Sequence, residues 1–250
     1  MLNLGFRRFR LGEIFRIPVY LDWSTIFLAL MFLQSGSVLF ALGLTIILLA
    51  SIIFHELAHS LTARCFGYET RDITLTVIGG CASLERMPSK AWQEFLTAAA
   101  GPASSIVFGI VLCILAGFTP HGNMLGDVLY CGGLINYGLA LFNLLPGFPM
   151  DGGRIFRSAL RLFFTRAKAT YVAMLVGRIA AVTLVAGPLL GITHIWIIPL
   201  GGSIILRALI AFMIWREGYR EYLSALDEER FTRWTQGDFN ARVSPPPYDD

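Results

Sequence analysis

Charged residues are scarce in this sequence: Asp, Glu, Lys and Arg make up only 15% of its 250 residues. Apolar residues make up 55%, and the mean hydropathy is +0.63. Soluble domains usually carry about 25% charged residues, so this composition excludes a soluble globular protein. The few charges nearly balance at a net +3, whereas a nucleic-acid-binding domain would show a basic face or stripe. We therefore expect no nucleic-acid partner.

Cysteine is also scarce. Cys65, Cys81, Cys113 and Cys131 show no CxxC or paired spacing, and a chain this apolar does not need disulfides to hold a core. We therefore expect free thiols. A signal-peptidase motif is missing as well, because no small-residue cleavage site follows the first apolar stretch. This absence predicts a retained membrane anchor.

Long apolar runs dominate what is present. A helix needs about 20 mostly apolar residues to cross the hydrocarbon layer of a membrane. Six stretches meet this requirement, near residues 18–37, 39–64, 93–118, 126–146, 170–190 and 194–215. The sequence therefore predicts an α-helical integral membrane protein with about six transmembrane helices.

The basic residues predict how these helices cross the membrane. Three loops, near residues 35–40, 118–127 and 188–194, contain no Lys or Arg. Because Lys and Arg accumulate in cytoplasmic loops, both termini are predicted to be cytoplasmic, and we expect a multi-pass protein of the cell (inner or plasma) membrane. Residues 1–216 would form the six-span domain. The acidic, Pro-containing segment 217–250 would form a short cytoplasmic tail that is partly disordered.

An ionisable motif interrupts the second apolar run, where charged side chains are costly and therefore indicate function. This motif is His55-Glu56-Leu57-Ala58-His59. Residues four apart on a helix face the same way, so His55 and His59 can hold one zinc ion. Glu56 can then act as a general base on a metal-bound water. Two histidines that only hydrogen-bond neighbouring helices would leave Glu56 at membrane depth unexplained.

A catalytic zinc usually has three protein ligands, so the two histidines need a third. His121 and His194 lie in loops opposite the arginine-rich side, far from the cytoplasmic end of the motif's helix. Asp151 follows the fourth span back to the cytoplasmic side, among prolines and glycines that break helical structure. A carboxylate is an accepted zinc ligand. Taken alone, however, this acid is better explained as a helix cap or an ordinary interfacial residue.

One segment between the second and third spans has a different pattern. Residues 72–78 alternate and are rich in β-branched side chains, and Gly79 and Gly80 follow them, which indicates a strand and a turn. An edge strand beside the metal could pair with an unwound substrate, which makes Gly79 and Gly80 candidate substrate-binding residues. A hairpin that only packs on the helices explains the pattern equally well. The small-residue run 98–105 indicates close helix packing.

Together these motifs resemble the site-2 protease family of intramembrane zinc metalloproteases, peptidase family M50. The resemblance covers most of residues 13–216 and rests on HELAH at 55–59, Asn143 through Gly152, Ile17 through Tyr20, Gly79-Gly80 and Ala100-Gly101-Pro102. It implies a zinc metalloendopeptidase with one Zn²⁺ ion that cuts in or near transmembrane segments of membrane proteins. Its substrates would be single-pass or membrane-associated proteins.

The resemblance also assigns roles to individual residues. The zinc ligands would be His55, His59 and Asp151, with Glu56 as general base and Asn143 hydrogen-bonding the substrate carbonyl or its oxyanion. The active site would lie near the cytoplasmic face. Many members carry PDZ or CBS domains, and the loops and tail here have no room for them, so this chain resembles a short form. Regulation would then involve the spans, the tail or a separate regulatory protein.

Two other functions fit part of the pattern. A membrane metal-ion transporter would distribute coordinating residues along a path through several spans, whereas those of this sequence cluster towards one face. An inactive relative that binds membrane helices without cutting them would have no use for the Glu56 carboxylate.

Overall fold

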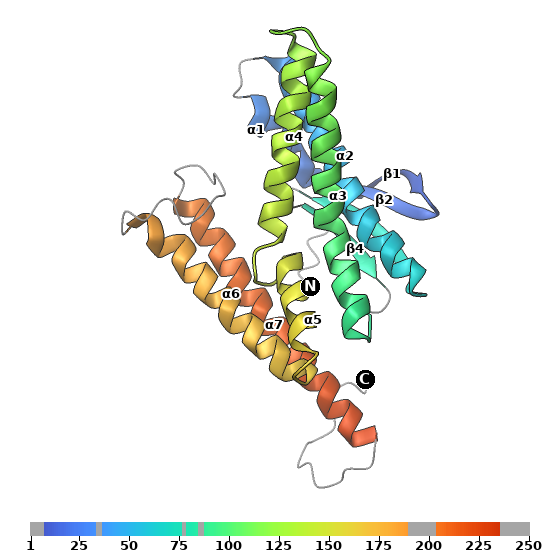
Figure 1. Ribbon diagram of the computed structural model, residues 1–250, viewed down its shortest axis with the longest axis vertical. Coiled ribbons are helices and arrows are strands. Elements are labelled where there is room, and N and C mark those ends of the chain that lie inside the picture. The colour runs from blue at the N-terminus through green and yellow to red at the C-terminus, as the bar shows by residue number, and fades with distance from the viewer. Residues whose placement is uncertain (1–7, 34–36, 77–78, 85–87, 190–203, 236–250) are drawn as a thin grey trace. The chain divides into compact units, whose positions relative to one another are not determined.

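The computed structural model describes residues 8–33, 37–76, 79–84, 88–189 and 204–235. The chain divides into two compact units, Met1–Asn143 and Leu144–Asp250. Figure 1 labels helices and strands of the two units. The first unit contains β1 (Arg8–Ile14), β2 (Ile17–Asp22), a 3-10 turn (Trp23–Thr25), α1 (Ile26–Phe32), α2 (Val38–Cys65), β3 (Thr70–Thr76), β4 (Gly79–Leu84), α3 (Ala91–Gly117) and α4 (Met124–Asn143). The second contains α5 (Asp151–Leu160), α6 (Arg166–Leu189) and α7 (Ile204–Thr235).

Four of the helices among the described residues are long and apolar enough to cross a membrane: α2, α3, α4 and α6. They coincide with the second to fifth predicted spans, which confirms a multi-pass, mostly helical membrane protein. The sixth predicted span, 194–215, overlaps α7 from Ile204 onwards, and its first part lies outside the described residues. Helix α7 then continues to Thr235.

The first predicted span, residues 18–37, is not a single helix. Its first part is strand β2, which pairs with β1 across a two-residue turn at Phe15 and Arg16, whose φ angles are 51° and 65°. Asp22 then accepts a hydrogen bond from the Ser24 N–H at 2.8 Å and starts a new turn. Helix α1 that follows has 7 residues, too few to cross the hydrocarbon layer. The length of the apolar run predicted a helix here, but the β-branched residues at the start of the run favour a strand.

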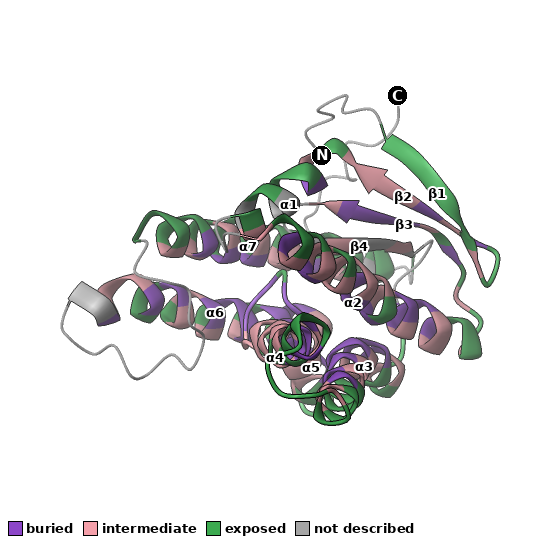
Figure 2. Cartoon of the chain, turned by 90° about the horizontal axis from the view of Figure 1, so that it is seen from above, coloured by how far each residue is buried: buried purple, intermediate pink, exposed green. Residues whose placement is uncertain are grey.

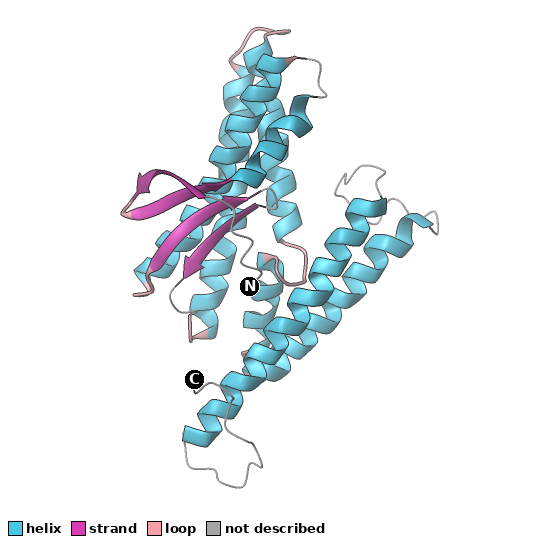
Figure 3. Cartoon of the chain, turned by 180° about the vertical axis from the view of Figure 1, so that it is seen from behind, coloured by secondary structure: helices cyan, strands magenta, loops and turns pink. Residues whose placement is uncertain are grey.

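The strands form a four-stranded sheet in the order β1-β2-β3-β4, seen as magenta arrows in Figure 3. β2 and β3 are parallel, whereas the outer pairs are antiparallel. The predicted strand after the second span is thus confirmed as part of a larger sheet. Gly79 and Gly80 do not form the predicted turn, because their pairing with Thr76 and Leu75 places them inside β4.

The sheet packs on α2. Residues on one face of β2 and β3 form a core with two residues of α2: Ile17, Val19, Ile73 and Leu75 with Ile52 and Leu57. Figure 2 shows the contrast between the exposed strand β1 and the largely buried β3. Because Ile52 and Leu57 flank His55 and Glu56, the sheet is anchored on the part of α2 that carries the HELAH motif.

Among the described thiols, Cys65, Cys113 and Cys131 are free, as predicted. The side chain of Cys81 lies outside the description.

A buried ion pair ties α5 to α7 in the second unit. Arg157 is only 1% exposed, and its guanidinium donates to Glu221 at 2.7 Å while lying 4.9 Å from the centre of the Phe148 ring. Burial raises the pKa of Glu221, but the charges of Arg157, Arg154 and Arg166, with the hydrogen bond from Arg157, outweigh burial and lower this pKa below its usual 4.5.

We expect Glu221→Gln to destabilise the protein by about 2 kcal/mol, because it removes the carboxylate charge that accepts a hydrogen bond from the buried Arg157 guanidinium. The matched control is Glu228→Gln, which removes the exposed pair with Arg166 and should cost less than about 0.5 kcal/mol. Unfolding in detergent, followed by circular dichroism, measures both variants.

The pH dependence of this difference follows from the lowered pKa. The stabilisation by Glu221 is complete above its ordinary pKa of 4.5 and is lost as the pH falls through the lower pKa of the folded state. Equal losses in the two variants, or a difference that grows on acidification, would contradict this account.

Candidate metal centre

The two histidines of the HELAH motif lie side by side inside the first unit. Both are buried, and their Nε2 atoms are 3.2 Å apart. Two nitrogens that each bind a tetrahedral zinc at 2.0–2.1 Å are themselves about 3.3 Å apart. The His55–His59 pair therefore has the spacing of two ligands of one metal ion.

Helix α3 fixes the orientation of both rings through their other nitrogens. The Nδ1 atom of His59 lies 2.6 Å from the Thr97 carbonyl oxygen, and Nδ1 of His55 lies 3.0 Å from the Ser105 hydroxyl. A carbonyl can only accept a hydrogen bond, so His59 carries its proton on Nδ1. In the neutral ring, Nε2 then presents its lone pair towards His55, as a metal ligand requires.

Gly101 of α3 shapes the space in front of the two rings. A Cβ atom at this position would lie 2.7 Å from Nε2 of His55 and would also meet Nε2 of His59. The space that this methyl group would fill is in contact with the Nε2 atoms of both histidines. A single atom placed there could therefore bind both nitrogens. The donor set and this space fit a zinc ion.

The Glu56 carboxylate lies beside the edge strand. A Cβ atom at Gly80 would lie 2.8 Å from Oε1 of Glu56 and 2.8 Å from Cγ2 of Ile52, so the β4 backbone passes directly next to this acid. Among the described strands, β4 has β3 on one side and is the last strand of the sheet. The last strand and a carboxylate are thus neighbours in the first unit.

Asn143 is the last residue of α4 and of the first unit. Its side-chain NH₂ donates to the Leu139 carbonyl at 3.0 Å, one turn earlier in the same helix. The hydrogen bond from Asn143 to the substrate carbonyl or its oxyanion stays a prediction.

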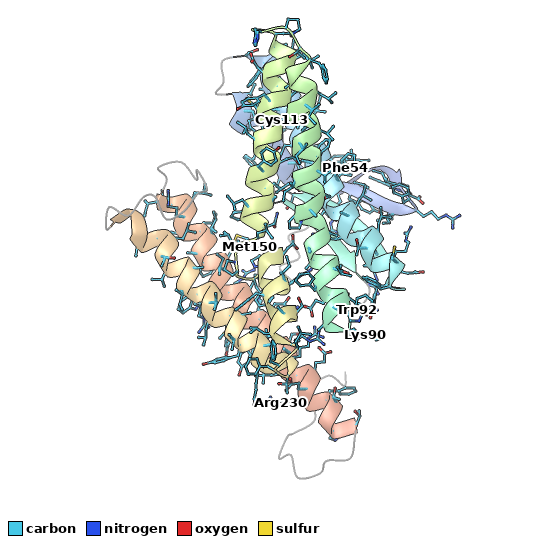
Figure 4. All side chains as sticks on the ribbon, in the orientation of Figure 1. Phe54, Lys90, Trp92, Cys113, Met150 and Arg230 are labelled. Carbon is cyan, nitrogen blue, oxygen red and sulfur yellow. The ribbon has the colours of Figure 1, made fainter. Side chains whose placement is uncertain are left out.

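Asp151 lies in the second unit, where it is buried at the start of α5. The two glycines after it pack against the preceding chain: a Cβ at Gly152 would collide with the Leu144 and Leu145 carbonyls, and one at Gly153 would meet Gly147. Met150, labelled in Figure 4, directly precedes this helix. Because they have no Cβ atom, the two glycines allow the chain before Asp151 to pack closely against the start of α5.

The structure accounts for the remaining candidates. His121 is exposed in the turn between α3 and α4, and His194 lies outside the described residues. The sequence interpretation missed the contacts that α3 makes with the histidines. Thr97, Gly101 and Ser105 recur every four residues and so share one helix face, and this spacing was the available signal. The small-residue run was interpreted as packing surface alone.

Gly101→Ala should lower the affinity for zinc by at least about tenfold, the usual loss when a group around the metal ligands is displaced. The added methyl group would force the imidazole rings apart. Gly117→Ala is the control, because it changes the same helix at a position with no heavy atom within 4 Å. Chelator competition on the purified protein measures the affinity, and equal values for both variants would contradict the assignment.

Comparisons with known proteins agree with this geometry. The family model of peptidase family M50 matches residues 43–125 and 119–187. The chain is 37% identical over 208 residues to sll0528 of Synechocystis, which carries a provisional zinc metalloprotease name, and 34% identical over 193 residues to zinc metalloprotease MJ0392 of Methanocaldococcus jannaschii. These matches cover 77% and 76% of this chain but 54% and 56% of the relatives. The chain thus spans little more than half the length of these curated relatives.

A solved structure gives the same relationship at the level of the fold. The site-2 protease from Methanocaldococcus jannaschii superposes with a TM-score of 0.61 at 30% sequence identity, over 86% of this chain and 95% of the other. The family model covers more than half of the residues, and the solved structure is matched over nearly all of its length. The chain belongs to peptidase family M50, the family of the site-2 proteases.

Proposed function

We propose that this protein is an intramembrane zinc metalloprotease that hydrolyses peptide bonds in or near the transmembrane segments of other membrane proteins, as in regulated intramembrane proteolysis. The observation that carries the proposal is the His55–His59 pair, with Nε2 atoms 3.2 Å apart on a helix apolar enough to cross a membrane. The relatives' names and the family membership support it. A site without catalysis would have no need of Glu56 next to the pair.

His55, His59 and Asp151 would hold the zinc ion. Two imidazoles and one carboxylate are a common ligand set for catalytic zinc, and they leave one position for water or substrate. When bound, zinc would supply Lewis acidity, which lowers the pKa of water and polarises a carbonyl group.

Glu56 would move the protons of the reaction. Its carboxylate is half-buried and lies one residue from the first ligand. It would accept a proton from the attacking water and later deliver it to the leaving nitrogen. The Asn143 amide would donate to the oxygen on which negative charge develops, after it releases the Leu139 carbonyl.

The substrate would bind along β4. A peptide bond inside a membrane helix is protected until that helix unwinds, and an unwound segment needs new partners for its N–H and C=O groups. The edge of β4 offers such partners by strand addition, and Gly80 brings this edge next to Glu56. Gly79 and Gly80 would thereby let substrate and general base approach each other closely.

The active site would open towards the cytoplasm, and both termini would lie there. The HELAH motif lies in the second half of α2, and Arg64 in the final turn donates to the Phe15 carbonyl of the β1–β2 turn at 2.8 Å. The motif is therefore closer to the helix end that carries Arg64. Basic residues accumulate on the cytoplasmic side of cell membranes.

Glu56→Gln should abolish cleavage of a single-span substrate in liposomes, with a loss of at least about a thousandfold, while zinc stays bound. Asp151→Asn should lower both zinc content and cleavage, because it weakens a ligand. Gel analysis of the products and metal analysis of the same preparations give the two readouts.

Three results would contradict this proposal. Cleavage that survives in Glu56→Gln would remove the general base. Unchanged zinc affinity in Asp151→Asn would remove the third ligand. Zinc flux across the liposomes without cleavage would replace the protease with a transporter.

Strand addition along β4 predicts a periodic effect of the substrate backbone. Synthetic substrates would carry one ester in place of one amide at successive positions beside the cut. We expect kcat/KM to fall several-fold at every second position, since alternate N–H groups of a strand face the same neighbour. Losses without this period of two would exclude pairing with β4.

A further inference from the structure

An apolar groove lies between α6 and α7 in the second unit. Its volume is about 430 Å³, and it is lined by Ala181, Val182, Val185, Ala186, Ala211, Phe212 and Trp215. Val182 and Phe212 are 54% and 60% exposed. The lining belongs to the predicted spans 170–190 and 194–215, so we expect the groove to lie within the membrane.

A positive charge marks one end of this groove. The Arg178 guanidinium lies 4.5 Å from the centre of the Trp215 ring. Its Nε atom is buried without a hydrogen-bond partner, and no acidic side chain in the described part of the chain pairs with it. Arg157, Arg166 and Arg216 of the same unit, in contrast, each bind a glutamate. Arg178 therefore lacks the anion that these three arginines have.

Arg178 and the groove follow one another along α6 in the same order as the charged head group and the acyl chain of a lipid. From Arg178, the side towards Arg166 and Glu228 is charged, as that ion pair of 2.9 Å shows. The groove extends the other way, along residues 181–186 of α6. Figure 4 labels Arg230 on the charged part of α7, beyond the groove. A phosphate at Arg178 would thus have its acyl chain among the apolar side chains.

We propose that this groove binds an anionic phospholipid, whose phosphate takes the hydrogen bonds of Arg178 beside Trp215 and whose acyl chain fills the space from Trp215 to Ala186. Guanidinium groups bind phosphate through two parallel hydrogen bonds, and Trp side chains concentrate at the depth of lipid head groups.

The site borders the segment that precedes Asp151. Gly177, the neighbour of Arg178, approaches Gly147 so closely that a Cβ at Gly177 would lie 3.0 Å from the Gly147 Cα. A bound lipid would hold α6 in place at this contact. The consequence for catalysis rests on the proposed function, whereas lipid binding itself does not.

The test counts lipids bound to the full-length protein by native mass spectrometry during titration with phosphatidylglycerol or phosphatidylcholine in detergent. We expect wild type to prefer phosphatidylglycerol. Arg178→Gln should lower that affinity about tenfold, the loss for one charged hydrogen-bonding partner, and remove the preference over phosphatidylcholine, whose own cationic group already neutralises its phosphate. Ala186→Leu should lower it as well, because the larger side chain fills the groove.

The matched control is Arg216→Gln, next to Trp215, whose charge already binds Glu217 at 2.8 Å and whose loss should not change binding. Equal affinities of wild type for the two lipids, unchanged binding in Arg178→Gln, or an equal loss in Arg216→Gln would each overturn the proposal. So would cross-linking of a photoreactive residue at position 182 to a model transmembrane substrate instead of lipid. No readout uses cleavage or zinc, so lipid binding and the protease function can fail separately.

Discussion

The first unit depends on holding two imidazole rings in fixed orientation inside an apolar helix bundle. Both rings are buried, so the protein itself must supply the hydrogen-bond partner of each Nδ1 atom. Helix α3 does so through the Thr97 carbonyl and the Ser105 hydroxyl. These contacts hold α3 against the part of α2 that carries the HELAH motif.

Close backbone approach is the second condition. Gly101 lies against the rings of α2, Gly80 lies against Glu56, and in the second unit Gly147 lies against Gly177. At each of these positions a single methyl group would displace a neighbouring residue. The glycines, which have no side chain, thus determine the distances between elements as much as the larger residues do. This explains why short Gly-containing motifs carried so much of the family resemblance.

The sequence was most informative where one physical requirement dominates. Apolar length identified α2, α3, α4 and α6, and the spacing of His55 and His59 brought their Nε2 atoms together. The sequence interpretation failed for residues 18–37, where length favoured a helix, but the β-branched neighbours of Pro18 favoured a strand, and proline itself is disfavoured inside a helix. The turn predicted at Gly79 and Gly80 was also wrong, because the register of a strand depends on the strand it pairs with as well as on its own residues. The contacts of Thr97 and Ser105 needed the relative rotation of two helices, which no local pattern contains.

The parallel pairing of β2 with β3 has a consequence for how the chain is made. β1 and β2 can form a hairpin as soon as they are synthesised, but Val19 pairs with Ile73, which leaves the ribosome about 50 residues later, and such distant pairs form slowly. In between, the chain must pass through α1 and α2 and come back to the same sheet. The sheet can therefore be completed only after α2 has the correct orientation, which makes strand pairing a check on the topology of the first long helix.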